Sequence, residues 1–93
     1  MNIFSNLRMY AGKWSVRETR AFTPEEIAQV AQAVVVPSQY GNSVQFTMVG
    51  GGLTYIPLDQ NSNCGVGEVI DLTTATLTTL CKSGENDIYR VTV

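Results

Sequence analysis

Basic and aromatic residues alternate near the start of the chain, and this pattern is the clearest chemical signal in the sequence. Four of the six basic residues fall within the first 20 positions. The interleaved set is Arg8, Tyr10, Lys13, Trp14, Arg17, Arg20 and Phe22. Positive side chains can follow a phosphate backbone while rings stack on bases, each stack contributing about 1–3 kcal/mol. The segment therefore favours a surface for single-stranded nucleic acid.

The charge is distributed unevenly along the 93 residues. Residues 1–20 carry four positive charges and one negative charge, whereas the remainder carries two positive and seven negative charges. The net charge is −2 and the sequence pI is about 4.8, which excludes a strongly basic nucleic-acid module. The alternative interpretation is that Trp14, Phe22 and Phe46 form the core and that the arginines pair with carboxylates.

No arrangement of residues typical of a catalytic site is present. The chain has no histidine to activate one of its many hydroxyl groups. Glu25 and Glu26 follow Thr23-Pro24 and suit the start of a helix, and nothing places Lys13 or Lys82 beside a nucleophile. We therefore expect a protein that is not an enzyme.

The sequence also gives no reason to expect a metal or a cofactor. Cys64 and Cys81 lack a partner cysteine at zinc-binding spacing, so we expect free, mostly buried thiols. The glycines 50–52 precede an expected strand and lack a following Gly-Lys-Ser/Thr, so they suit a hairpin and not a phosphate-binding loop.

A short helix has a complete start signal. Thr23 can cap the first turn, Pro24 suits the first helical position, and Glu26 can reach back to the backbone of Thr23. Apolar residues then follow at helical spacing, and these are Ile27, Val30, Ala31 and Val34. We predict a helix over residues 24–32, followed by a β-branched run at 34–36 that favours a strand and ends at Pro37.

Several short segments are typical of strands. Residues 43–49 alternate, and residues 53–58 are expected to be their hairpin partner; 73–81 and 88–93 are further strands. In residues 13–22, alternation places Trp14, Val16, Glu18 and Arg20 on one face. Neither face is apolar, which indicates an edge strand or an extended arm.

These elements predict one domain over residues 1–93, with residues 1–12 suited to a mobile N-terminal arm. Five or six short strands separated by turns favour a mostly β fold, either a small five-stranded barrel or a curved antiparallel sheet. The alternative is a two-layer α+β arrangement, in which the helix covers one face of an antiparallel sheet.

The order of elements over residues 30–93 resembles the OB-fold. VAQAVVVPSQYGNSVQFTMVGGGLTYIPL is similar to its first three strands, VGEVIDL to an entry segment, and TATLTTL and DIYRVTV to the last two strands. The chain thereby resembles small single-stranded-DNA-binding proteins of phage or mobile-element type. The resemblance implies an OB-like barrel and adds Tyr40 and Tyr55 as residues that stack on bases.

The sequence thus leads to two functional hypotheses. The first is non-catalytic binding of single-stranded nucleic acid, specifically ssDNA, through the set Trp14, Arg17, Arg20, Tyr40, Tyr55 and Arg90. The second is a small assembly protein in which the N-terminal arm adds a strand to a neighbouring copy, giving a homo-oligomer. No segment approaches the ~20 apolar residues of a membrane span, and no leader-like apolar run is evident, so we expect no membrane partner and a cytoplasmic location.

Overall fold

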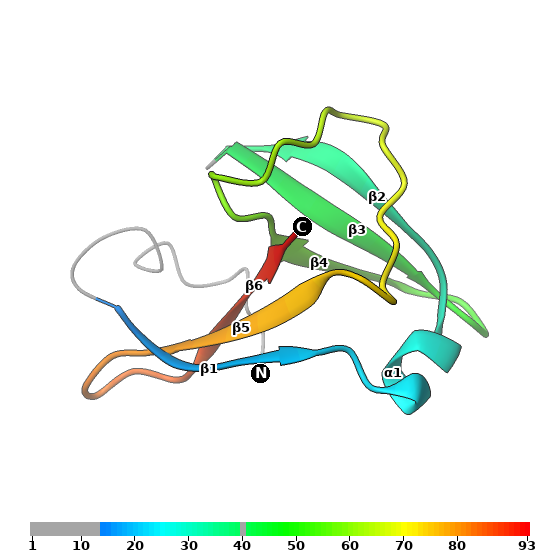
Figure 1. Cartoon of the computed structure of the whole chain (residues 1–93). Helices are drawn as coiled ribbons and strands as arrows, with labels where there is room; N and C mark the ends of the chain where they lie inside the picture. The colour runs from blue at the N-terminus through cyan, green and yellow to red at the C-terminus, as the bar shows by residue number, and fades with distance from the viewer. Residues whose placement is uncertain (1–13, 40) are drawn as a thin grey trace.

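The computed structural model describes residues 14–39 and 41–93, which form six strands and one short helix. The elements are β1 (Ser15–Ala21), α1 (Pro24–Ala28), β2 (Val30–Ser38), β3 (Gly41–Met48), β4 (Leu53–Pro57), β5 (Thr76–Cys81) and β6 (Ile88–Thr92). They make two three-stranded antiparallel sheets with the orders β1-β5-β6 and β2-β3-β4 (Figure 1). The mostly β character predicted from the sequence is confirmed.

Sheet β2-β3-β4 is a meander of two hairpins. Val44 and Phe46 point into the core from β3, while Gln45 and Thr47 lie on the opposite face, as the alternation predicts. The turn after β3 needs positive φ at three consecutive glycines, residues 50–52, which residues with a Cβ rarely adopt. The predicted hairpin between residues 43–49 and 53–58 is therefore confirmed.

Helix α1 is shorter than the predicted helix over residues 24–32. Its start has the expected capping box: Thr23 Oγ1 accepts from the Glu26 N–H at 3.1 Å, and Glu26 Oε1 accepts from the Thr23 N–H at 2.9 Å. Its end comes at Ala28, because Val30 already pairs with Met48 across β2 and β3. The β-branched residues of β2 are better accommodated in a sheet than in a helix. The strand also runs past Pro37 to Ser38, which an edge strand tolerates.

Strand β1 is an edge strand, as expected, but its faces differ from the predicted alternation. The register with β5 shifts between Val16 and Glu18, so Arg17 is an extra residue in a bulge. Paired residues share a face, so Val16 lies with Thr19 on the outer face of the sheet, and Arg20 lies on the other face opposite Leu77. The prediction that Val16, Glu18 and Arg20 share one face is therefore wrong.

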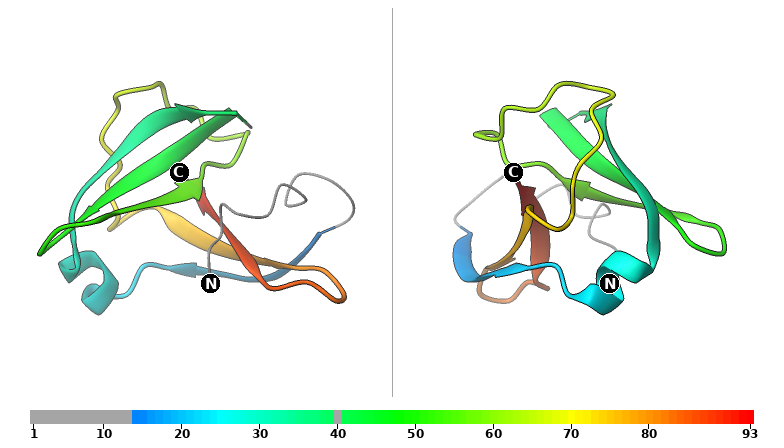
Figure 2. Two further views of the ribbon diagram at one scale, coloured as in Figure 1. Left: turned by 180° about the vertical axis from the view of Figure 1, so that it is seen from behind. Right: turned by 45° about the vertical axis from the view of Figure 1, so that its right-hand side comes forward.

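The hydrophobic core lies between the two sheets. Val35 and Val44 from one sheet and Val91 from the other are fully buried. The segment between β4 and β5 crosses over the molecule (yellow-green in Figures 1 and 2) and adds Leu58, Ile70, Leu72 and Ala75 to the core. Within it, the Gly67 N–H donates to Val35 O, and Glu68 O accepts from the Val35 N–H, so this segment covers the outer edge of β2.

The two sheets face one another, and this arrangement leaves the predicted five-stranded barrel unconfirmed. The described strands number six in two sheets and do not close into a barrel. Helix α1 has five residues, none of them buried, so the layer that covers each sheet is the other sheet and not the helix. The two-layer α+β alternative is therefore not the observed arrangement.

Substitution of Phe46 tests whether the assigned core stabilises the fold. The centre of the Phe46 ring lies 6.2 Å from that of Phe22, and Phe46 is 3% exposed, so Phe46→Ala removes contacts within the core. We expect a loss of about 3–5 kcal/mol in the free energy of unfolding, measured by urea denaturation. Val49→Ala is the control, because Val49 is 63% exposed and its truncation should change stability by less than about 0.5 kcal/mol. Equal losses in the two variants would contradict the assigned core.

Candidate nucleic-acid interface

Trp14 lies at the end of sheet β1-β5-β6 where β5 turns into β6. Its side chain packs against Leu80 and Ile88, which form a small apolar cluster separate from the main core. The Nζ atom of Lys82 lies 5.7 Å from the centre of the indole ring, within the range of a cation–π contact. An aromatic ring and a positive charge are thus brought together at this end of the sheet.

Arg17 projects from the bulge in β1 near the same turn. Its Nε lies 3.3 Å from Oδ2 of Asp87, the residue that precedes β6, and its side chain is 60% exposed. An ion pair so open to solvent contributes little to stability, and its guanidinium remains accessible. Arg17 therefore adds an accessible cation near this end of the sheet.

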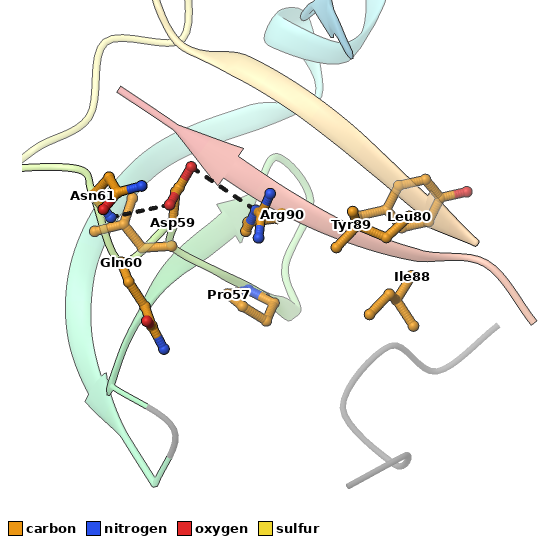
Figure 3. A pocket seen from close by; sticks show the side chains of 9 residues that line it. Pro57, Asp59, Gln60, Asn61, Leu80, Ile88, Tyr89 and Arg90 are labelled. Carbon is orange, nitrogen blue, oxygen red and sulfur yellow. Dashed lines mark hydrogen bonds and ion pairs between the residues drawn. The ribbon is translucent and has the colours of Figure 1, made fainter. Parts of the chain in front are cut away.

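Arg90 lies on the outer face of β6, opposite Thr78 of β5. It lines a pocket of about 250 Å³ between β6 and the chain that follows β4 (Figure 3). The closest acidic atom is Asp59 Oδ2, 3.9 Å from Arg90 Nε, which is too long for a hydrogen bond. Arg90 Nε is buried and has no hydrogen-bond partner among the described residues.

Arg20 is directed away from this surface. On the core-side face of β1, its Nη1 and Nη2 donate to the two carboxylate oxygens of Glu26 at 2.7 and 2.9 Å. This hydrogen bonding, together with the Thr23 N–H, lowers the pKa of Glu26 to about 2. Arg20 thus reinforces the start of α1.

The two tyrosines of the predicted site are not brought to Trp14. Tyr55 pairs with Gln45 on the outer face of sheet β2-β3-β4, so it belongs to the other sheet. Tyr40 lies outside the described residues. Of the six predicted binding residues, the structure places Trp14, Arg17 and Arg90 on the outer side or the end of sheet β1-β5-β6, and it places Arg20 and Tyr55 elsewhere.

Two residues of this region were missed in the sequence-based site. Ser15 pairs with Cys81, so their chain neighbours Trp14 and Lys82 also lie close together. Asp59 reaches Arg90 because the Asp59 N–H donates to Val91 O at 2.7 Å. Both contacts join residues far apart in the chain, so no local pattern indicates them.

Other candidate chemistry is sparse in the described part of the chain. Cys64 and Cys81 are free thiols, as expected, and both are half-buried. Burial, and then hydrogen bonding to Glu68, raise the pKa of Cys64. No three metal-binding side chains converge within residues 14–39 and 41–93. None of the helical structure described there has the length and apolar character needed to cross a bilayer.

Comparison with known protein families, curated proteins and solved structures gave no significant match. The chain is described structurally as a small, mostly β protein of two facing antiparallel sheets. Its function must therefore be inferred from the geometry of its own side chains.

The contact between Arg20 and Glu26 predicts a specific pH dependence. Because folding lowers the pKa of Glu26 from about 4.5 to about 2, its stabilising contribution is complete above pH 4.5 and disappears as the pH falls toward 2. Glu26→Gln should lower the free energy of unfolding by about 1 kcal/mol at neutral pH, a small value because the pair is partly exposed to solvent.

Urea denaturation at a series of pH values measures this effect. The difference between wild type and Glu26→Gln should shrink as the pH falls from 4.5 to 2. Glu25→Gln removes the same charge from the same turn of α1 and serves as the control. A difference between wild type and Glu26→Gln that stays constant over this pH range would contradict the assigned pair.

Proposed function

We propose that this protein binds single-stranded nucleic acid, specifically ssDNA, without catalysing a reaction. The observation that carries the proposal is the grouping of Trp14 with Arg17, Lys82 and Arg90 on one sheet. Arg17, Lys82 and Arg90 are three of the four basic residues in the described part of the chain. Rings that stack on bases beside cations that contact phosphates are the usual means of binding single strands.

The arrangement of strands supports the resemblance on which the proposal also rests. Leu58, the residue after β4, forms an isolated parallel bridge with Val91 of β6, which sets the sheet order β2-β3-β4 beside β6-β5. A partly open barrel of five strands that binds oligonucleotides on its surface is the architecture of the OB-fold. In this chain β1 occupies the remaining edge of β5.

The acidic neighbours of the cations shape the expected binding. Asp87 lies beside Arg17 and Asp59 beside Arg90, so an incoming phosphate group competes with a carboxylate at both positions. Because few cations contact phosphates, few counterions are released, and the affinity should fall only gently as salt is added. Stacking and contacts to bases then supply a large share of the affinity.

Substitutions of Arg17 and Asp87 should change the affinity for single strands in opposite directions. Arg17→Ala should weaken binding of a single-stranded oligonucleotide and reduce the slope of log K against log salt by about 1. Asp87→Asn should strengthen binding about two- to fivefold, because it frees Arg17 from an exposed ion pair. Trp14, the sole tryptophan, reports both by fluorescence titration.

Two variants are matched controls for charge. Arg20→Ala removes a positive charge from the opposite face of β1, and Glu25→Gln removes a negative charge from α1. Both should leave the affinity near that of wild type, provided that circular dichroism shows a folded chain. If the folded protein at low salt binds neither single strands nor duplex, the proposed function is wrong.

A second candidate function is self-assembly, and the exposure of β1 favours it. Six of the seven residues of this edge strand are exposed, and no described strand pairs with the edge of β1 that faces away from β5. A free strand edge is a template for another strand, although the bulge and the charges of β1 restrict which strands fit. Residues 1–12 of a second copy are the proposed added strand.

Truncation tests this assembly. Removing residues 1–12 should lower the molar mass measured by light scattering from that of an oligomer to that of one chain. Val16→Lys in the full chain should act likewise, because it places a charge on the exposed edge, whereas Val49→Lys, on a different exposed surface, should not. A full-length chain that is already monomeric would exclude the model.

A further inference from the structure

The pocket beside Arg90 combines apolar walls with a small set of polar groups. Leu80 and Ile88 come from the outer face of the β5-β6 hairpin, and Pro57 comes from the end of β4. Asp59 and Asn61 lie across the pocket from these residues, as Figure 3 shows. A volume of about 250 Å³ has room for a single heterocycle, since a cavity of about 150 Å³ accommodates benzene.

Arg90 supplies one buried hydrogen-bond donor, Nε–H, that no described residue satisfies. Its side chain is 36% exposed, yet Nε is buried without a hydrogen-bond partner among the described residues. Buried donors are almost always paired in folded proteins, so an unpaired one indicates a missing acceptor. An acceptor atom of a ligand in this pocket would complete the guanidinium.

Asp59 supplies a carboxylate held in a fixed position. Its Oδ1 accepts from the Asn61 N–H at 3.0 Å, and its Oδ2 accepts from Thr92 Oγ1 at 3.2 Å. The side chain is 17% exposed, and each oxygen retains a lone pair for a further donor. The pocket therefore offers a fixed acceptor only 3.9 Å from an unsatisfied donor.

This combination selects a neutral ligand over a phosphate group. The carboxylate of Asp59 repels an anion at the position where Arg90 would attract it. A neutral ring with acceptors and donors next to each other along one edge suits both groups at once. Guanine has this edge, with the acceptors N7 and O6 followed by the donors N1–H and N2–H.

We propose that the pocket binds one guanine base of a single-stranded nucleic acid. Arg90 donates to O6 and N7, the pairing that arginine makes most often with guanine, while Asp59 accepts from N1–H and N2–H. Pro57, Leu80 and Ile88 contact the apolar ring faces. The proposal rests on the proposed function, and it adds a base preference to it.

Adenine is the informative competitor because it has the same ring size. It presents an amino donor where guanine has O6, and its unprotonated N1 faces the carboxylate. Both hydrogen-bonding positions are therefore mismatched in adenine. Since one good bidentate contact discriminates by about 1–3 kcal/mol, we expect guanine to bind about tenfold more tightly than adenine.

The test measures binding of the full chain to labelled single-stranded oligonucleotides by fluorescence anisotropy. One oligonucleotide contains thymine alone, and the others carry a single central guanine, adenine, hypoxanthine or 7-deazaguanine. We expect the guanine oligonucleotide to bind about tenfold more tightly than the adenine one. Hypoxanthine lacks the N2 donor and 7-deazaguanine lacks the N7 acceptor, so each should bind more weakly than guanine.

Variants assign the preference to the pocket. Asp59→Asn should abolish the preference for guanine over adenine, whatever its effect on the affinity for the thymine oligonucleotide. Asp87→Asn makes the same change of charge at the Arg17 pair and should keep the preference, whatever its effect on overall affinity. The base analogues keep the test decisive if Asp59→Asn fails to fold, because they alter only the ligand.

The outcomes separate this proposal from the proposed function. Equal affinity for the guanine and adenine oligonucleotides, or a guanine preference that survives Asp59→Asn, would overturn the guanine pocket and leave single-strand binding standing. An absence of binding to every oligonucleotide would overturn the proposed function itself.

Discussion

A short parallel contact between the end of β4 and β6 holds the two sheets in their relative positions. Leu58 bridges Val91, and the Asp59 N–H donates to Val91 O at 2.7 Å, while the Leu58 N–H donates to Asn42 O at 2.9 Å. Leu58 and Val91 are also members of the core. The same few residues therefore join the sheets, close the core and bring the chain after β4 against β6. The pocket between Asp59 and Arg90 exists because of this contact.

The distribution of charge limits what the surface can bind. Each of the three described arginines has a carboxylate within 4 Å, and Arg20 is fully committed to the helix start. A protein that relied on phosphate contacts alone would need more unpaired cations. Arg17 forms an exposed ion pair, and Arg90 lies beside a fixed carboxylate. Both features suit binding in which phosphate contacts contribute modestly to the affinity and contacts to bases contribute more. The two proposals share this electrostatic basis.

The bulge at Arg17 separates structural from accessible residues on a single strand. Before the bulge, Val16 faces outward with Leu80; after it, Thr19 regains that face and Arg20 turns toward α1. One extra residue thus leaves Arg17 in solvent and directs Arg20 into the capping interaction with Glu26. The bulge also disrupts the regular outer edge of β1, and such irregularity restricts pairing with other strands.

Local physical chemistry in the sequence was sufficient to predict the elements whose causes are local. The start of α1 follows from Thr23, Pro24 and Glu26, whose hydrogen bonds span three residues. The hairpin around the glycines 50–52 follows from alternation and positive φ. Only the tertiary structure decided where α1 ends, because strand pairing with β3 outweighs the helical spacing of Val30.

The candidate site depended even more on tertiary structure. Trp14 meets Lys82, and Asp59 meets Arg90, through strand register and the contact between the sheets. Amino-acid type alone identified Trp14, Arg17 and Arg90 as candidates. It did not indicate which cations are already paired, because that depends on carboxylates that are distant in sequence and adjacent only after folding.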